Sequence, residues 1–201
     1  MSTLWTFGDS FTEGHGCRVG DEYYENYRKS GDKIWSVWLS ELLGVNLLNL
    51  GVGGSSNDMI LDSIIDNWSE IKENDYVFIG STYPHRFDVP IDNKLKSIVH
   101  DFKDANLTIE EIETIINFKY YFSNNILYKN RQYKRFNWIK RLLISKGCKL
   151  VVLWDVEIDT KNLETITGAT NREILDGHLS YNSHNILALQ FYKKYIKKDL
   201  L

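Results

Sequence analysis

The chain has little cysteine and no long apolar run. Its two cysteines, Cys17 and Cys148, are too few and too far apart for a disulfide framework or a cysteine-rich metal site. We therefore expect free thiols in a reducing compartment. No apolar run approaches the roughly 20 residues that span a bilayer, so we expect no membrane partner.

Strong charge of one sign is also missing. The chain has 24 Lys and Arg against 27 Asp and Glu, which gives a net charge of −3. This balance argues against nucleic acid as the main partner. One local segment, residues 129–135, is basic and aromatic. We interpret it as the solvated face of an amphipathic helix rather than as a nucleic-acid patch.

The first residues carry no basic segment, and we expect no cleaved signal peptide. The protein is then expected in the cytoplasm or released by a non-classical route, as some phage proteins are. A length of 201 residues suits a single domain over residues 1–201 with a sizeable core.

Apolar segments of strand length alternate with segments of helical periodicity. Strands are predicted at residues 3–7, 46–50, 76–79 and 149–154, and helices at residues 34–43, 58–68 and 185–198. Asp32 and Asn57 are the expected N-caps of the first two helices, and Gly44 is placed to end the first. This alternation favours a three-layer α/β/α sandwich with a mainly parallel central sheet.

Residues 81–146 break the alternation and form a predicted insertion. It begins as a loop and becomes helical at Thr108, which with Glu111 has the spacing of a capping box. The following residues, to about residue 145, are rich in aromatic and basic side chains. We expect one or two helices here that pack on the sheet, one of them a candidate lid.

The most informative segment is residues 8–10 (Gly-Asp-Ser), directly after the first predicted strand. It places Ser10 at the carboxyl end of a strand, where open α/β sheets bind their ligands. A serine nucleophile needs a neighbouring base, which is usually histidine. His178 is the best candidate, because Asp176 lies two residues before it on a predicted turn and can orient its ring. We expect His85, His100 and His184 to be surface or core residues.

A tetrahedral intermediate also needs hydrogen-bond donors aimed at its oxyanion. The backbone N–H of Ser10 is one candidate. The glycine-rich turn at residues 51–54 is another, because glycines allow close backbone approach and a predicted helix begins just after them.

Three ordered blocks of this sequence resemble the SGNH, or GDSL, hydrolase family of esterases and lipases. The first is residues 8–10, and the second is Asn49 followed five residues later by Gly54. The third is residues 176–178, shortly before the last predicted helix. The resemblance extends over residues 8–184.

The resemblance implies an α/β/α fold of SGNH or flavodoxin-like type and an esterase that needs no metal or organic cofactor. It implies Ser10 as the nucleophile, His178 as the base and Asp176 as the orienting carboxylate. The N–H groups of Ser10 and Gly54 are then the expected oxyanion donors.

The sequence departs from the family pattern at two places. Thr82 stands where the family has an asparagine that donates to the oxyanion, so the Thr82 hydroxyl is the expected substitute. The spacing from Asp176 to His178 is one residue shorter than usual. Asp155 and Glu157 therefore remain alternative orienting carboxylates.

The substrate pocket is expected to include residues around these blocks, namely Asp9, His15, Tyr83 and Arg86. Arg86 suits an acidic group on the substrate, although a structural ion pair is an open alternative. Tyrosines at residues 23–27 suit either stacking on a sugar ring or covering the core.

We therefore predict a serine esterase that hydrolyses a small acyl ester, with O-deacetylation of a carbohydrate as the leading hypothesis. One alternative is a catalytically weakened or inactive protein of the same fold that binds carbohydrate or has a structural role. Another is an acyltransferase or thioesterase.

Overall fold

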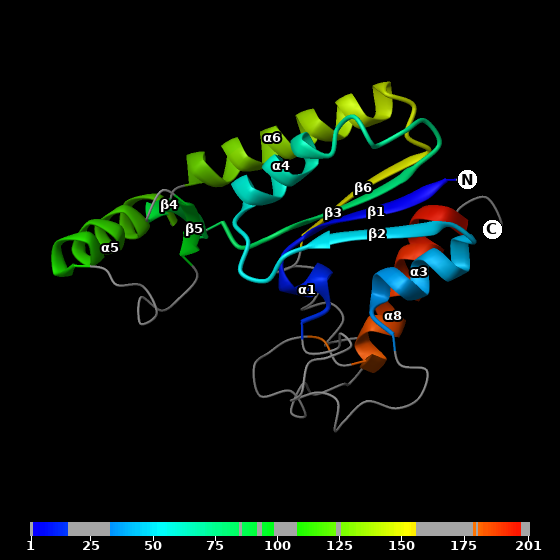
Figure 1. Cartoon of the computed structure of the whole chain (residues 1–201), viewed down its shortest axis with the longest axis horizontal. Coiled ribbons are helices and arrows are strands. Elements are labelled where there is room, and N and C mark those ends of the chain that lie inside the picture. Colours follow the sequence, from blue (N-terminus) through cyan, green and yellow to red (C-terminus); the bar gives the residue numbers. More distant parts are fainter. Residues whose placement is uncertain are drawn as a thin grey trace.

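The sheet has four parallel strands in the order β2-β1-β3-β6 (Figure 1). The computed structural model describes residues 2–15, 33–84, 86–91, 94–98, 108–123, 126–155, 179 and 181–197. The strands are β1 (Thr3–Gly8), β2 (Asn46–Gly51), β3 (Tyr76–Ser81) and β6 (Leu150–Asp155). All four strands were predicted from the sequence, and the predicted parallel sheet is confirmed.

Helices cover both faces of this sheet, which confirms the three-layer architecture. The elements are α1 (Ser10–Glu13), α3 (Trp35–Leu43), α4 (Asn57–Asp66), α5 (Ile109–Ser123), α6 (Ile126–Ser145), α8 (Tyr181–Phe191) and the π-helix η2 (Tyr192–Ile196). Figure 1 shows α4 and α6 on one face of the sheet and α3 and α8 on the other.

The core consists of two apolar clusters that the sheet separates. Side chains alternate between the faces of a strand, so neighbouring residues of β1 belong to different clusters. Leu4 packs with Trp35 and Phe191 from α3 and α8. Trp5 packs on the opposite face with Ile64 from α4. The continuous apolar sequence of the strands therefore reflects burial on both faces.

Because the strands are parallel, their carboxyl ends meet at one edge. We call this the carboxyl edge; it is formed by Gly8, Gly51, Ser81 and Asp155. β1 lies in the interior of the sheet and pairs with both β2 and β3. The segment after β1 thus starts in the middle of the carboxyl edge, where open α/β sheets hold their ligands.

The region between β3 and β6 contains an element that the sequence did not suggest. The strands β4 (Phe87–Ile91) and β5 (Lys94–Ile98) form an antiparallel hairpin. This hairpin and α5 lie beyond the end of the sheet, whereas α6 returns along it (Figure 1). The predicted capping box at α5 is confirmed, since Glu111 N–H donates to Thr108 Oγ1 and Thr108 N–H donates to Glu111 Oε2.

Cap residues were predicted with mixed success. Gly44 ends α3 in the left-handed conformation with φ of 64°, as expected. The prediction that Asp32 caps α3 is wrong, because the helix begins at Trp35 and its N-cap is Ile34, which makes no side-chain capping bond. Asp32 itself lies outside the described residues. The N-cap of α4 is Ser56 and not Asn57, because Ser56 Oγ accepts the N–H of Met59. Asn57 is the first helical residue, and its side chain has other partners.

Candidate functional site

Ser10 is the first residue of a four-residue helix that begins directly after β1. Asp9 is its N-cap and accepts the N–H of Phe11 at 3.0 Å. Gly14 ends the helix with φ of 82°, and its N–H donates to Ser10 O. Ser10 is 5% exposed. Ser10 therefore lies at the carboxyl end of β1, as predicted, and the structure adds that β1 is an interior strand.

Glycines at the strand ends hold this short helix against the carboxyl edge. A Cβ on Gly8 would overlap the Thr12 side chain, and a Cβ on Gly51 would overlap the backbone N of Glu13. A backbone contact of this kind cannot move aside as a flexible side chain does. These two glycines therefore fix the depth at which α1, and with it Ser10, lies on the sheet.

The glycine-rich turn after β2 lies beside Ser10. A Cβ built on Gly53 would be 3.8 Å from Ser10 Cβ. The Gly53 N–H donates to Glu13 Oε2 at 2.9 Å, and Gly54 has φ of 78°, which favours glycine. Sequence analysis predicted that Ser10 and this turn meet. It missed Glu13, whose only signal was its position three residues after Ser10.

Asp9 is the centre of a buried polar cluster next to the candidate nucleophile. Its side chain is fully buried. Asp9 Oδ2 accepts the Thr82 hydroxyl at 2.6 Å and Arg86 Nη1 at 2.8 Å, while Oδ1 accepts Phe11 N–H. A buried carboxylate needs this degree of hydrogen bonding and pairing. We expected Asp9 to line the substrate pocket; the contacts that the structure gives it are these internal ones.

The Thr82 hydroxyl is directed at Asp9. A hydroxyl has one hydrogen, so Thr82 cannot donate to an oxyanion while that hydrogen bond to Asp9 is present. The predicted oxyanion role of Thr82 would require the bond to break. The side chain is 5% exposed, so its surroundings are largely closed to water.

Arg86 connects the loop after β3 to the segment that carries Ser10. Its side chain is 8% exposed, and its guanidinium is 5.2 Å from the Tyr83 ring centroid. The ion pair with Asp9 is the structural alternative that the sequence left open for Arg86. Within the described part of the chain, Arg86 Nε has no hydrogen-bond partner.

Asn57 fixes the backbone of Thr82 from the other side. Asn57 Oδ1 accepts Thr82 N–H at 2.8 Å, and Asn57 Nδ2 donates to Thr82 O at 3.0 Å. Asn57 Nδ2 also donates to Gln132 Oε1 on α6 at 2.8 Å. Asn57 and Gln132 are 2% and 4% exposed. Sequence analysis assigned Asn57 to a helix cap and did not single out Gln132, because their partners are distant in sequence.

A half-buried acid, Asp88, lies near the start of α4. Asp88 Oδ2 accepts the Ser56 hydroxyl at 2.6 Å. Burial raises the pKa of Asp88 above its usual value, and the nearby Asp58 and Asp62 add to this, while the Ser56 hydrogen bond opposes it. Sequence analysis did not single out Asp88, because the hairpin that carries it was not predicted.

Several predicted site residues lie outside the described residues. These are His178, Asp176, His85, His100, Glu157 and the tyrosines at residues 23–27. Asp155, one of the alternative carboxylates, ends β6 at the carboxyl edge. His184 is a core residue on α8, as expected; it is 1% exposed and its Nδ1 accepts Trp35 N–H. His15 N–H donates to Ser10 O, so its backbone adjoins the nucleophile turn.

The described residues contain neither a metal-binding cluster nor a membrane-spanning helix. Among them, no group of three or more His, Cys, Asp or Glu side chains is arranged to hold a metal ion. No helix in the same residues is both long enough and apolar enough to cross a bilayer.

No family model and no curated protein matches this sequence. Solved structures of similar fold include a G-D-S-L family lipolytic protein from Desulfitobacterium hafniense, with 13% identity, TM-score 0.39 and coverage of 96% of this chain and 99% of that one. A catalytic mutant of an acetylxylan esterase from Geobacillus stearothermophilus has 15% identity, TM-score 0.41 and coverage of 96% and 93%. A G-D-S-L family protein from Veillonella parvula has 13% identity, TM-score 0.41 and coverage of 96% and 97%. These similarities concern the fold and give no residue a role.

Proposed function

We propose that this protein is a serine esterase that removes a small acyl group, such as acetyl, from a carbohydrate. The observation that carries the proposal is the position of Ser10 at the carboxyl edge, beside the glycine turn and directly after the buried Asp9. Nucleophilic catalysis needs a serine held in a fixed place next to backbone donors. The carbohydrate part of the proposal comes from the sequence resemblance.

In the proposed mechanism, Ser10 Oγ attacks the ester carbonyl carbon while His178 takes the hydroxyl proton. Asp176 orients His178, and the N–H groups of Ser10 and Gly54 donate to the oxyanion. The bond from the carbonyl carbon to the sugar oxygen then breaks, and His178 returns the proton to that oxygen. Water attacks the acyl-enzyme by the same route and releases the carboxylic acid and free Ser10.

The buried cluster supports this mechanism indirectly. Asp9 precedes Ser10 and is bonded to Thr82 and Arg86 from the loop after β3. We assign Thr82 and Arg86 to positioning, because their contacts with Asp9 hold the backbone on which Ser10 lies. A nucleophile displaced by about 1 Å loses on the order of 100-fold in rate.

A fluorophosphonate probe tests the proposal directly, since it labels only an activated serine. We expect labelling of the native protein and loss of labelling in Ser10→Ala and His178→Ala. Ser145→Ala, at the exposed end of α6, is the matched control and should label as the native protein does. Absence of labelling in the native protein would contradict the proposal.

Substrate screening then separates short acyl groups on sugars from long acyl chains. We expect release of acetate from acetylated oligosaccharides and slower cleavage of p-nitrophenyl esters with long acyl chains. Cleavage of the long-chain esters alone would contradict the carbohydrate assignment and leave the esterase assignment intact.

The proposed base predicts a pH dependence. A general base acts in its neutral form, so kcat/KM should rise with pH as the proposed base His178 loses its proton. The measurement is kcat/KM for an acetyl ester between about pH 5 and 8. A flat profile over that range would argue against histidine as the base.

One observation favours a second candidate, a carbohydrate-binding protein without turnover. The Thr82 hydroxyl is engaged by Asp9, so one expected oxyanion donor is missing. Losing one such donor costs on the order of 100-fold to 1000-fold in turnover. Glycan binding that Ser10→Ala leaves unchanged, with no turnover, would support this candidate. Thr82→Asn is then the informative variant, because an amide has two hydrogens and can serve both Asp9 and an oxyanion.

A further inference from the structure

The charge of the molecule is distributed unevenly between two neighbouring helices. The 20 residues of α6 contain six of the 24 basic residues and none of the 27 acidic ones. The helix α4, beside it on the same face of the sheet, contains three aspartates and no basic residue. The Arg135–Asp58 ion pair joins the two helices. The sequence is acidic as a whole, so the basic character of α6 is a local feature.

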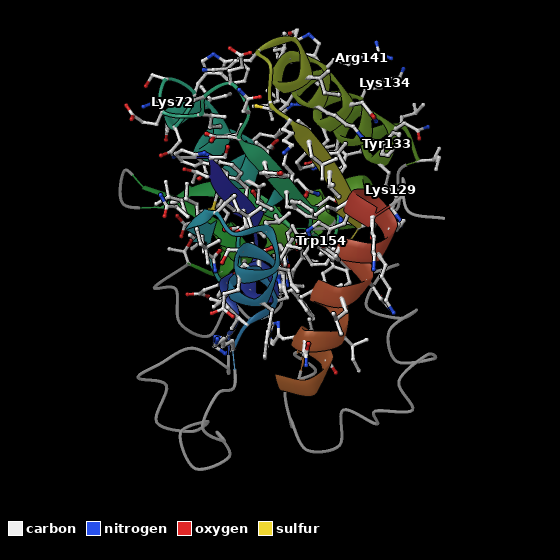
Figure 2. All side chains as sticks on the ribbon, turned by 90° about the vertical axis from the view of Figure 1, so that its right-hand side faces the viewer. Lys72, Lys129, Tyr133, Lys134, Arg141 and Trp154 are labelled. Carbon is white, nitrogen blue, oxygen red and sulfur yellow. The ribbon has the colours of Figure 1, made fainter. Side chains whose placement is uncertain are left out.

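One face of α6 is basic and points away from the sheet. Residues 131, 134, 138 and 141 repeat at intervals of three and four, which places Arg131, Lys134, Trp138 and Arg141 along one stripe. All four are exposed, whereas Phe136 and Leu143 on the opposite face are buried in the core. Figure 2 shows Lys134 and Arg141 following one another along α6. We call these four residues the α6 stripe.

The basic side chains of the α6 stripe are not neutralised by ion pairs in the part of the chain that the structure describes. Within the described residues, Arg131, Lys134 and Arg141 take part in no ion pair. Trp138 is 60% exposed, and Tyr133 at the border of the stripe is 68% exposed. Exposed aromatic rings between unpaired cations are typical of a binding surface, because water solvates such rings poorly.

We propose that the α6 stripe binds an acidic polysaccharide, so that the substrate is an esterified chain of sugars that carry carboxylates. The proposal rests on the proposed function for its sugar component. Guanidinium and ammonium groups would pair with the carboxylates, and the Trp138 ring would pack on the apolar face of a sugar. Arg131 and Arg141 are about 15 Å apart along the helix axis, a span that suits a linear polymer.

The acidic α4 favours a narrow polymer over a broad anionic surface. A nucleic-acid duplex or a membrane is wider than one helix and would also lie over the exposed Asp62 and Asp66 of α4, which repel it. A single polysaccharide chain can follow α6 and avoid them. The surface thus selects by width as well as by charge.

The α6 stripe also leads toward the candidate site. Gln132, next to Arg131, accepts a hydrogen bond from Asn57, which in turn holds the Thr82 backbone. Thr82 contacts Asp9, the neighbour of Ser10. A polysaccharide bound along α6 would therefore have one of its ends near the carboxyl edge, beside the first half of the helix.

Binding of fluorescein-labelled oligogalacturonate to the Ser10→Ala protein, followed by fluorescence anisotropy at low and high salt, tests the proposal. This variant turns over no substrate by the proposed route, so the result does not depend on esterase activity. Labelling of native Ser10 by the fluorophosphonate probe tests the proposed function separately. We expect binding that weakens with added salt.

Charge reversal on the stripe should weaken binding specifically. We expect Lys134→Glu/Arg141→Glu to raise the Kd by at least about 10-fold, and Trp138→Ala to raise it by about 5-fold. Lys72→Glu/Lys193→Glu makes the same change in net charge at exposed sites outside α6 and should change the Kd by less than about 2-fold. Equal effects of both charge-reversal pairs would overturn the proposal.

Competing ligands identify the partner class. Polyglutamate should bind more weakly than oligogalacturonate, because it has carboxylates but no sugar ring. Tighter binding of oligo(dT), or of phosphatidylserine vesicles, would overturn the proposal in favour of nucleic acid or a membrane. Absence of oligogalacturonate binding at low salt would refute it outright. Circular dichroism melting of the α6-stripe and control variants should match that of their Ser10→Ala parent, since every further altered side chain is exposed.

Discussion

Two buried aspartates lie at opposite edges of the sheet and differ in how they are satisfied. Asp75 lies at the edge of the sheet where the strands begin, which we call the amino edge, and is 4% exposed. Asp9 lies at the carboxyl edge and is fully buried. Asp75 accepts the backbone N–H groups of Thr3 and Lys72 and the indole N–H of Trp5, all neutral donors. Asp9 accepts one backbone N–H and one hydroxyl, and in addition pairs with the cation of Arg86.

The difference shows that a buried, hydrogen-bonded aspartate can either stabilise the sheet or position a candidate functional residue. Asp75 joins the start of β1 to the turn before β3, so it stabilises the sheet alone. Asp9 joins the end of β1 to the loop after β3 through Thr82 and Arg86. The backbone held in this second case carries Ser10. The loop after β3 is therefore coupled to the candidate nucleophile through Asp9.

Arg86→Met should produce the largest effect, because it leaves the Asp9 carboxylate buried without its cation. Breaking a buried ion pair from one side costs about 3–5 kcal/mol of unfolding free energy. Urea denaturation measures this change. The double variant Asp9→Asn/Arg86→Met removes both charges and should recover part of the loss. A loss below about 1 kcal/mol in the single variant would show that the pair is not buried in solution.

Asp75→Ala removes the buried carboxylate at the amino edge of the sheet. It leaves three donors without their acceptor, and we expect a loss of about 2–4 kcal/mol of unfolding free energy. Asp75 lines a pocket of about 630 Å³ that water can enter, so the loss should be smaller than for Arg86→Met. The rate of Ser10 labelling in the folded protein should be unchanged. A large fall in that rate would show that the two edges are coupled.

Thr82→Val removes one hydrogen-bond donor from Asp9 while it keeps the shape of the side chain at residue 82. A hydrogen bond to a charged group contributes about 1.5–3 kcal/mol, and we expect a stability loss in the lower part of that range. Ser10 labelling should also slow. Thr82→Ser keeps the hydroxyl and is the matched control. If Thr82→Val labelled as fast as the native protein, the hydroxyl would have no positioning role.

Asp88→Asn should give the smallest effect, visible as a change in pH dependence. The pKa of Asp88 is raised in the folded protein, so the folded state binds the proton more tightly than the unfolded chain. Its contribution to stability is therefore present at low pH and is lost as the pH rises from the ordinary value through the raised pKa. Urea unfolding of both proteins from pH 3.8 upward should show a flatter profile for the variant. Identical profiles would contradict the raised pKa.

The strands and the position of Ser10 could be predicted because their causes are local. The strands are short apolar runs bounded by turn residues, and Ser10 lies two residues after the end of the first of them. The parallel direction of the strands could be predicted because parallel strands need crossover connections, which are usually helical. The strand order β2-β1-β3-β6 was not predicted. In these segments neighbouring residues and the fold require the same conformation.

The polar cluster could not be predicted because its partners are far apart in sequence. Asp9 meets Thr82 across 73 positions and Arg86 across 77. Ser56 and Asn57 are both good cap residues, and the contact of Asn57 with Thr82 decides which of them caps α4. The proposed roles of His178 and Asp176 stay predictions.

The central place of β1 in the sheet has a consequence for the order of folding. The ribosome makes β1 before both of its partners, which are residues 46–51 and 76–81. The apolar β1 therefore stays unpaired until these partners have been made, a situation that slows folding and favours aggregation. Ser10 has its full set of neighbours only after Thr82 and Arg86 have emerged. The nascent chain thus acquires its candidate nucleophile turn later than its first strand pair.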